Sequence, residues 1–225
     1  MSFKENFDKA KRGWHWLWYS DSIWSWLVAI IVIFIFVKFI FFPALSLIMG
    51  TSLPLAGVES SSMDHQIVKD DIGRLTLCDK VFNEGYREYI NFDKYWNNCG
   101  KWYEDNGISK NYFSTFSLKN GFRKGDIIIV WGRFKPKVGD VIIFKPNSDS
   151  QAPRPIIHRI IKIDNGIMQT KGDHNAQQLT KSNNYYKTDE TNITQEQIIG
   201  KAIFKIPYLG WIKILASEFV GRIFG

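Results

Sequence analysis

The chain has 225 residues, which is enough for one domain of ordinary size together with a membrane anchor. Hydrophobic residues make up 45% of the chain and aromatic residues 16%, so a disordered or low-complexity protein is excluded. The net charge of +7 comes from scattered basic residues, which argues against nucleic acid as a partner and fits a surface beside anionic lipid.

The N-terminal part of the chain predicts a membrane anchor. Residues 1–22 contain basic and aromatic residues, and the apolar residues 23–42 carry a single charge, Lys38. A helix of about 20 apolar residues spans the core of a bilayer, and Trp and Tyr favour its interfaces. The run is longer than the core of a signal peptide and is not followed by a small-residue cleavage site, so we expect a retained single-pass anchor in the cell membrane. The positive-inside rule predicts that residues 1–22 are cytoplasmic and that the remainder is extracytoplasmic.

The segment after the anchor, residues 43–63, remains apolar but contains helix-breaking residues. Pro43, Gly50 and Pro54 predict that one continuous helix does not extend through it. We therefore expect this segment to run along the membrane surface and to enter a strand that leads to Ser62.

Residues 64–122 are predicted to form an irregular insertion with its own small hydrophobic cluster. They are rich in Asn, Tyr, Trp, Phe and charged residues and have no clear period. Both cysteines of the chain, Cys78 and Cys99, lie here. One disulfide bond suits an exported domain, and a pair of free buried thiols fits the sequence equally well.

Residues 123–207 predict a mainly β body. Short β-branched runs bounded by Gly, Pro and Asn are typical of strands. They occur at residues 126–131, 140–144, 155–163 and 198–206. We expect these strands to form a small, coiled, β-barrel-like body. The last segment, residues 208–225, has an apolar helical face and predicts an amphipathic helix on the membrane surface, with packing on the β body as the alternative.

Several residues of this chain could carry chemistry, although each signal is weak alone. The serine tract at residues 60–62 is of a kind that usually forms a turn or a cap. His158 lies in an apolar strand, where a histidine is more often structural, and Asp173 lies in a Lys-Gly-Asp turn, where it usually caps backbone N–H groups. Together they could supply a serine nucleophile, a base that titrates near neutral pH and a carboxylate that orients the imidazole.

The order of these motifs resembles that of type I signal peptidases, specifically the archaeal and endoplasmic-reticulum branch. Residues 60–63 read Ser-Ser-Ser-Met, where the family has Ser-Gly-Ser-Met. His158 stands where this branch has histidine and most bacterial members have lysine, and residues 171–175 match the Lys-Gly-Asp-Asn-Asn box except that histidine replaces its first Asn. The resemblance covers about residues 54–63 and 123–211 and leaves the insertion unexplained.

The resemblance implies a membrane-bound serine endopeptidase that removes N-terminal signal peptides from exported preproteins at the outer face of the membrane, without a metal or cofactor. Ser62 would be the nucleophile and His158 the general base. The Ser60 hydroxyl and the Ser62 backbone N–H would form the oxyanion hole. An extended substrate would lie beside the segment before the nucleophile. The residues expected to bind it are Val58, Glu59 and Ser61.

The acid of the expected triad departs from the family pattern. In this branch a second acid commonly follows the aspartate of the Lys-Gly-Asp box, and its position here is Leu179. Either Asp173 or a shifted acid, Asp189 or Glu190, could orient His158. We prefer Asp173.

The expected partners are exported preproteins and the lipid bilayer, and the sequence does not identify accessory subunits. Leu179 also supports an alternative class of protein, a non-catalytic membrane-anchored β module in which Ser62 and His158 are structural. An envelope scaffold that binds a protein partner through the insertion belongs to the same class. A protease of the self-cleaving repressor class would have a similar β body, but it uses lysine as its base and lacks an anchor.

Overall fold

The computed structural model describes residues 3–70, 72–84 and 90–210. The chain divides into two compact units, residues 1–48 and residues 49–225. In the first unit, α1 (Phe3–Tyr19) is followed by α2 (Ile23–Phe36), the π-helical turn η1 (Val37–Phe41) and α3 (Phe42–Met49), whose last residue opens the second unit. Ser22 caps the N-terminus of α2, because its side chain accepts a hydrogen bond from the Trp24 N–H.

Among the described residues, one helical stretch, Ile23–Met49, is long and apolar enough to cross a membrane. Its 27 residues correspond to about 40 Å at the rise of an α-helix, more than the roughly 30 Å of a bilayer core. The helix passes Pro43 and ends at Met49, directly before Gly50 with its positive φ, so no continuous helix runs through residues 43–63, as expected. The Phe42 N–H donates to the Val37 carbonyl, five residues back. This widened π turn lies directly before Pro43, where a regular turn would bring the proline ring against the preceding carbonyl.

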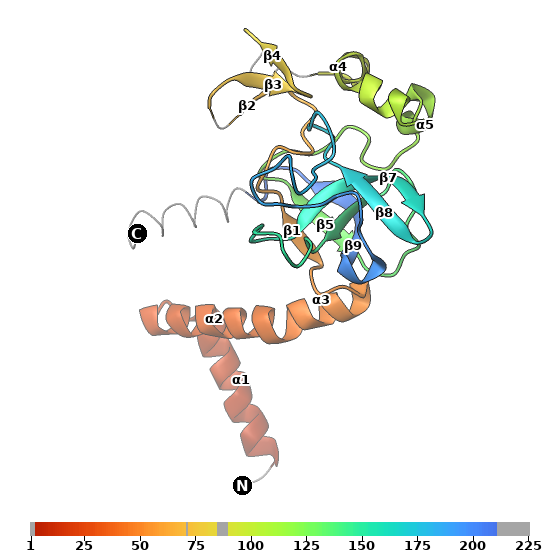
Figure 1. The fold of residues 1–225 in the computed structure, drawn as a ribbon. Helices are drawn as coiled ribbons and strands as arrows, with labels where there is room; N and C mark the ends of the chain where they lie inside the picture. The colour runs from red at the N-terminus through yellow and green to blue at the C-terminus, as the bar shows by residue number, and fades with distance from the viewer. Residues whose placement is uncertain (1–2, 71, 85–89, 211–225) are drawn as a thin grey trace. The chain divides into compact units, whose positions relative to one another are not determined.

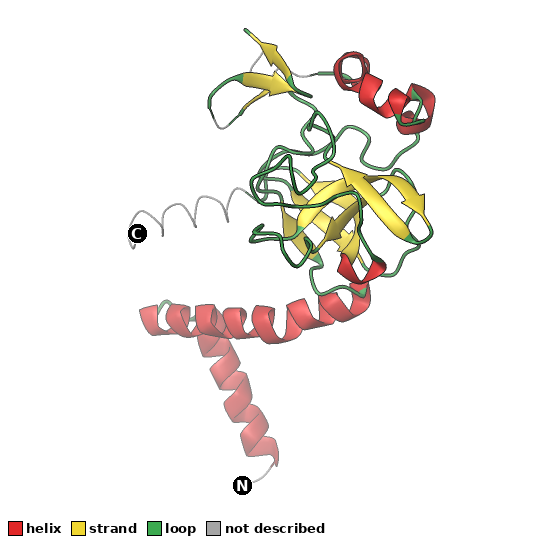
Figure 2. Ribbon diagram, viewed as in Figure 1, coloured by secondary structure: helices red, strands yellow, loops and turns green. Residues whose placement is uncertain are grey.

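The second unit is built on a six-stranded antiparallel sheet with the order β1-β5-β9-β6-β7-β8. Its strands are β1 (Leu55–Gly57), β5 (Ile127–Trp131), β6 (Val141–Phe144), β7 (Ile156–Asp164), β8 (Ile167–Lys171) and β9 (Ile198–Ile206). Figure 1 labels β1, β5, β7, β8 and β9, and Figure 2 colours the strands yellow. The mainly β body and its four predicted strand runs are confirmed. The sheet of the described residues is open, with β1 and β8 at its edges, rather than closed into a barrel.

The core of the sheet lies on both sides of β6, whose residues are all buried. Val141 and Ile143 belong to one hydrophobic cluster, and Ile142 and Phe144 belong to another on the opposite face. This double burial explains why the sequence of β6 is continuously apolar instead of alternating.

The β7–β8 hairpin sets the positions of the residues around His158. Its loop consists of Asn165 and Gly166, both with positive φ, as a two-residue hairpin turn requires. The pairing then shifts between Ile160 and Lys162, where a β-bulge inserts one residue into β7. After the bulge, Arg159 faces Lys171, so the next residue along, Gly172, comes beside His158.

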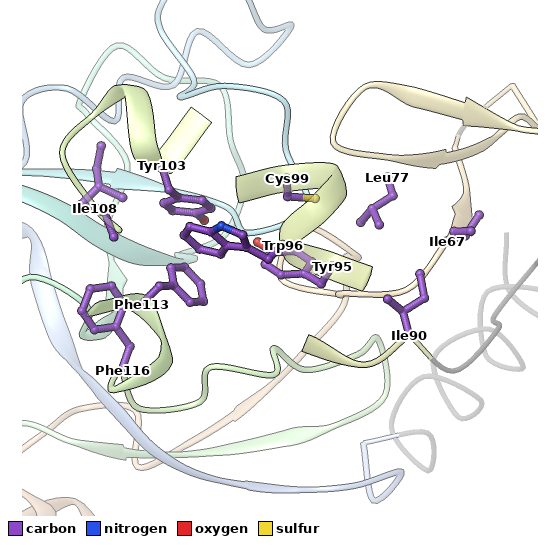
Figure 3. Close-up of a cluster of buried hydrophobic side chains, with 11 residues drawn as sticks. Ile67, Leu77, Ile90, Tyr95, Trp96, Cys99, Tyr103, Ile108, Phe113 and Phe116 are labelled. Atoms are coloured by element: carbon purple, nitrogen blue, oxygen red, sulfur yellow. The ribbon is translucent and has the colours of Figure 1, made fainter. Parts of the chain in front are cut away.

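The insertion contains regular structure as well as the expected hydrophobic cluster. It forms a three-stranded sheet of β2 (Val68–Lys69), β3 (Leu75–Leu77) and β4 (Lys80–Phe82), followed by α4 (Phe92–Asp105) and α5 (Lys110–Ser114). A disulfide bond joins Cys78, in the turn between β3 and β4, to Cys99 in α4. Figure 3 shows the aromatic side chains that gather between the two helices. The predicted terminal helix at residues 208–225 lies largely outside the described residues.

Candidate active site

The serine tract follows β1 with its backbone fixed. Met63 is 1% exposed and packs in the core of the sheet. The Ser62 carbonyl accepts a hydrogen bond from the His174 backbone N–H at 2.8 Å. Ser62 itself is half-buried, and its Oγ lies 3.1 Å from the Oγ of the exposed Ser60. Two hydroxyl groups are therefore held next to each other at the end of a well-anchored segment.

His158 is buried in β7 and its Nδ1 contacts the carboxylate of Glu190, which is also buried. The Oε1 of Glu190 accepts a second hydrogen bond from the Thr170 hydroxyl at 2.9 Å. Its Oε2 accepts a hydrogen bond from the Leu179 backbone N–H at 2.7 Å. These donors satisfy the buried carboxylate, and a ring that donates to it through Nδ1–H keeps Nε2 as its acceptor nitrogen.

Gly172 marks the point where the imidazole and the serine segment meet. A Cβ on this residue would lie 2.8 Å from the Nε2 of His158 and 2.8 Å from the carbonyl oxygen of Ser62. No side chain fits at residue 172 unless one of these groups moves. The structure therefore brings the Nε2 of His158 close to the backbone of Ser62.

Asp173 does not make the contact with His158 that we preferred from the sequence. Its carboxylate accepts hydrogen bonds from Arg159 Nη2 at 2.7 Å, from His65 Nε2 at 2.9 Å and from the Tyr103 hydroxyl at 2.9 Å. The reason is the register of β8, which brings residue 172 beside the imidazole and directs the next side chain towards Arg159. The acid in contact with His158 is Glu190, which was one of the alternatives.

The Asp173 carboxylate is ionised although it is fully buried. Burial alone would raise the pKa of Asp173, but Arg159 and His65 hold that pKa well below its ordinary value. Burial lowers the pKa of His65, so the neutral ring donates through Nε2 to the carboxylate. Burial also lowers the pKa of Lys171 to about 8, and its Nζ donates to the Gly172 carbonyl at 3.0 Å.

The residues expected to bind the substrate have different environments. Val58 is 4% exposed, and its backbone is hydrogen-bonded to residues 125–126, so its side chain belongs to the core. Glu59 forms an ion pair with Arg154. Ser61 is half-buried beside them. The Glu59–Arg154 pair connects the segment that precedes Ser62 to the segment that precedes β7, so the two segments that supply Ser62 and His158 lie close together.

Glu190 is hydrogen-bonded to the backbone of Leu179, the position at which the family pattern has its acid. The Leu179 carbonyl accepts the Glu190 N–H at 2.9 Å, and the Leu179 N–H donates to the Glu190 carboxylate. The other alternative, Asp189, instead accepts hydrogen bonds from the Thr191 backbone and hydroxyl. The sequence does place two acids, Asp189 and Glu190, in the loop after Leu179. Their spacing alone could not show which of the two contacts His158.

Comparisons with known proteins agree with the resemblance seen in the motifs. No family model matches the chain. The chain is 30% identical over 107 residues to the signal peptidase complex catalytic subunit SEC11 of Candida tropicalis, covering 45% of this chain and 61% of that protein. It is 28% identical over 109 residues to SEC11 of Pyricularia oryzae, covering 45% of this chain and 60% of that protein. The resemblance to the endoplasmic-reticulum branch is thereby confirmed, and the chain spans about three fifths of the length of these relatives.

Proposed function

We propose that this chain is a membrane-anchored serine endopeptidase that removes N-terminal signal peptides from exported preproteins. The observation that carries the proposal is the meeting point at Gly172, which lies against both the Nε2 of His158 and the backbone of Ser62. The contact of Glu190 with the opposite ring nitrogen supports it. Further support comes from the similarity to SEC11 catalytic subunits and from the apolar helix Ile23–Met49.

In the proposed reaction the Ser62 Oγ attacks the scissile carbonyl carbon, and its proton passes to the Nε2 of His158. The same proton then goes to the leaving amine as the C–N bond breaks. Water hydrolyses the resulting ester with His158 again as the base. Glu190 stabilises the imidazolium through Nδ1–H. The Ser60 hydroxyl and the Ser62 backbone N–H bind the oxyanion, and one such donor is worth roughly 3 kcal/mol of barrier.

The proposed substrate is an extended segment with small side chains near the scissile bond. Among the described residues β1 pairs only with β5, so its outer edge can take a substrate strand through backbone hydrogen bonds. Because the substrate's own apolar segment is in the bilayer, an anchored enzyme meets it in two dimensions with the scissile bond already oriented. In this proposal the N-terminus is cytoplasmic and the β body is extracytoplasmic.

The test is cleavage of a preprotein by the purified full chain in detergent. Wild type is expected to cut after a small residue, and Ser62→Ala is expected to abolish the cut because the attacking hydroxyl is lost. Ser182→Ala removes an exposed hydroxyl that lies outside the proposed site and contacts Thr180, and it is expected to retain cleavage. Full activity of Ser62→Ala would exclude Ser62 as the nucleophile, and an inactive wild type would contradict the proposed function.

A further inference from the structure

The turn formed by residues 172–174, here called the Gly172 turn, determines how Ser62 and His158 face each other. Gly172 lies against His158 Nε2 and the Ser62 carbonyl. The backbone N–H of His174, at the end of the same turn, donates to the Ser62 carbonyl at 2.8 Å. A displacement of this turn therefore moves the serine segment relative to the imidazole. Misplacement of about 1 Å near reacting groups can cost a hundredfold in rate.

Asp173, the middle residue of the Gly172 turn, is held by two tyrosines of the insertion. The Tyr103 hydroxyl donates to Asp173 Oδ1 at 2.9 Å, and the Tyr95 hydroxyl donates to the Asp173 carbonyl at 2.9 Å. Both tyrosines are fully buried, and burial raises the pKa of each well above its ordinary value, so both remain hydrogen-bond donors. Their spacing of two helical turns places both hydroxyls on the face of α4 that meets the β body.

The helix that carries these hydroxyls is itself fixed. Its buried face belongs to the aromatic cluster of the insertion (Figure 3), which also includes Ile161 of the β7 bulge. The disulfide bond joins Cys99 of α4 to Cys78. The Cys78 backbone N–H in turn donates to the His174 carbonyl at 3.1 Å. The disulfide thus connects the helix that binds Asp173 to a residue that binds the end of the Gly172 turn.

A third contact from the insertion also holds Asp173. His65 donates to Asp173 Oδ2 at 2.9 Å and stacks on the ring of Tyr95, with ring centroids 3.6 Å apart. Arg159 binds the carboxylate from the β body. The two-nitrogen contact of Arg159 and the hydroxyl and imidazole donors of the insertion together fix the orientation of the carboxylate.

We propose that the insertion, residues 64–122, acts as a positioning module for the peptidase site, with Tyr95 and Tyr103 as positioning residues that hold the Gly172 turn against Ser62 and His158. This inference rests on the proposed peptidase function and extends it to a segment that the family resemblance leaves unexplained. Neither tyrosine hydroxyl is required to touch the substrate. Their removal therefore affects the rate of the chemical step rather than the binding of the preprotein.

The experiment measures kcat and KM of preprotein cleavage for the full chain carrying Tyr103→Phe or Tyr95→Phe, with melting temperature as a check of the fold. Each substitution removes one hydroxyl and keeps the packed ring. The loss of one hydrogen bond that orients the site is expected to lower kcat about tenfold, with KM within about twofold of wild type. The matched control is Tyr112→Phe, which removes a hydroxyl from a half-exposed ring of α5 and is expected to leave both parameters unchanged.

The outcomes separate this inference from the proposed function. If wild type cleaves and Ser62→Ala does not, the peptidase assignment holds whatever the tyrosine variants do. Wild-type kcat in both folded tyrosine variants would then overturn the positioning role. An increase in KM at constant kcat would overturn it as well, because that pattern belongs to substrate binding. Loss of the fold in both variants would assign the hydroxyls to folding rather than to positioning.

Discussion

At the scale of single residues, the acid that orients the imidazole gives the sharpest prediction. Glu190→Gln replaces the carboxylate at Nδ1 of His158 with a neutral amide, which no longer stabilises the imidazolium and can favour the wrong tautomer. We expect kcat for preprotein cleavage to fall by about a thousandfold or more, with a smaller change in KM. The neighbouring Asp189→Asn supplies the control, because the Asp189 carboxylate contacts Thr191 rather than the imidazole.

The comparison of these two variants also tests the alternative acids of the sequence analysis. Equal losses in Glu190→Gln and Asp189→Asn would indicate damage to the loop rather than removal of the orienting acid. A Glu190→Gln enzyme with wild-type kcat would show that His158 acts without this carboxylate. The melting temperatures of both variants, measured beside the kinetics, identify any loss that comes from unfolding.

At the scale of elements, strands with a simple pattern could be predicted and elements set by tertiary contacts could not. The β-branched runs of β5, β6, β7 and β9 are read directly from the sequence. The aromatic and polar residues of α4 concealed its helical spacing, although Tyr95, Cys99 and Tyr103 repeat at intervals of one turn and are all buried. The acid that contacts His158 could not be predicted, because its position depends on the bulge in β7 and on the path of the long loop that carries Glu190. No local sequence pattern indicates either feature.

The disulfide bond also acts between elements, because it joins the turn between β3 and β4 to α4. Cys78 and Cys99 are separated by 21 residues, and closing a loop of this length stabilises a domain by about 3 kcal/mol in the chain-entropy account. The double variant Cys78→Ser/Cys99→Ser is expected to lose about that much free energy of unfolding. Urea unfolding followed by tryptophan fluorescence can measure it, because Trp96 lies buried on α4.

Reduced wild type provides the comparison for that measurement. If the cross-link is the source of the stability, wild type in a reducing agent should unfold at the same urea concentration as the double variant. An unchanged midpoint in both samples would contradict a stabilising role for the bond. A loss in the double variant alone would point to the serine substitutions themselves rather than to the missing cross-link.

At the scale of the whole molecule, buried ionisable groups connect the insertion to the β body and make its stability depend on pH. His65 donates to Asp173 beside Arg159, and His174 donates to the Asp64 carbonyl within the same region. Burial lowers the pKa of both histidines. In the unfolded chain these side chains take up protons near their ordinary pKa of about 6.5, so the folded state binds fewer protons than the unfolded state just below that pH.

The second unit should therefore become less stable as the pH falls from about 7.5 to about 5.5. The sign follows from a lowered folded-state pKa, for which the contribution to stability is present above the unfolded value and is lost as the pH falls through the folded value. Lys171, whose lowered pKa is about 8, completes its protonation at the upper end of this window and there adds to the fall, and Asp173 remains ionised throughout. The melting temperature of the full chain in detergent is expected to fall over this range, and the fall should be smaller in His65→Gln, which keeps a side-chain donor but does not titrate. A melting temperature that is constant or rises on acidification would show that the histidines are not buried as neutral donors between the insertion and the β body.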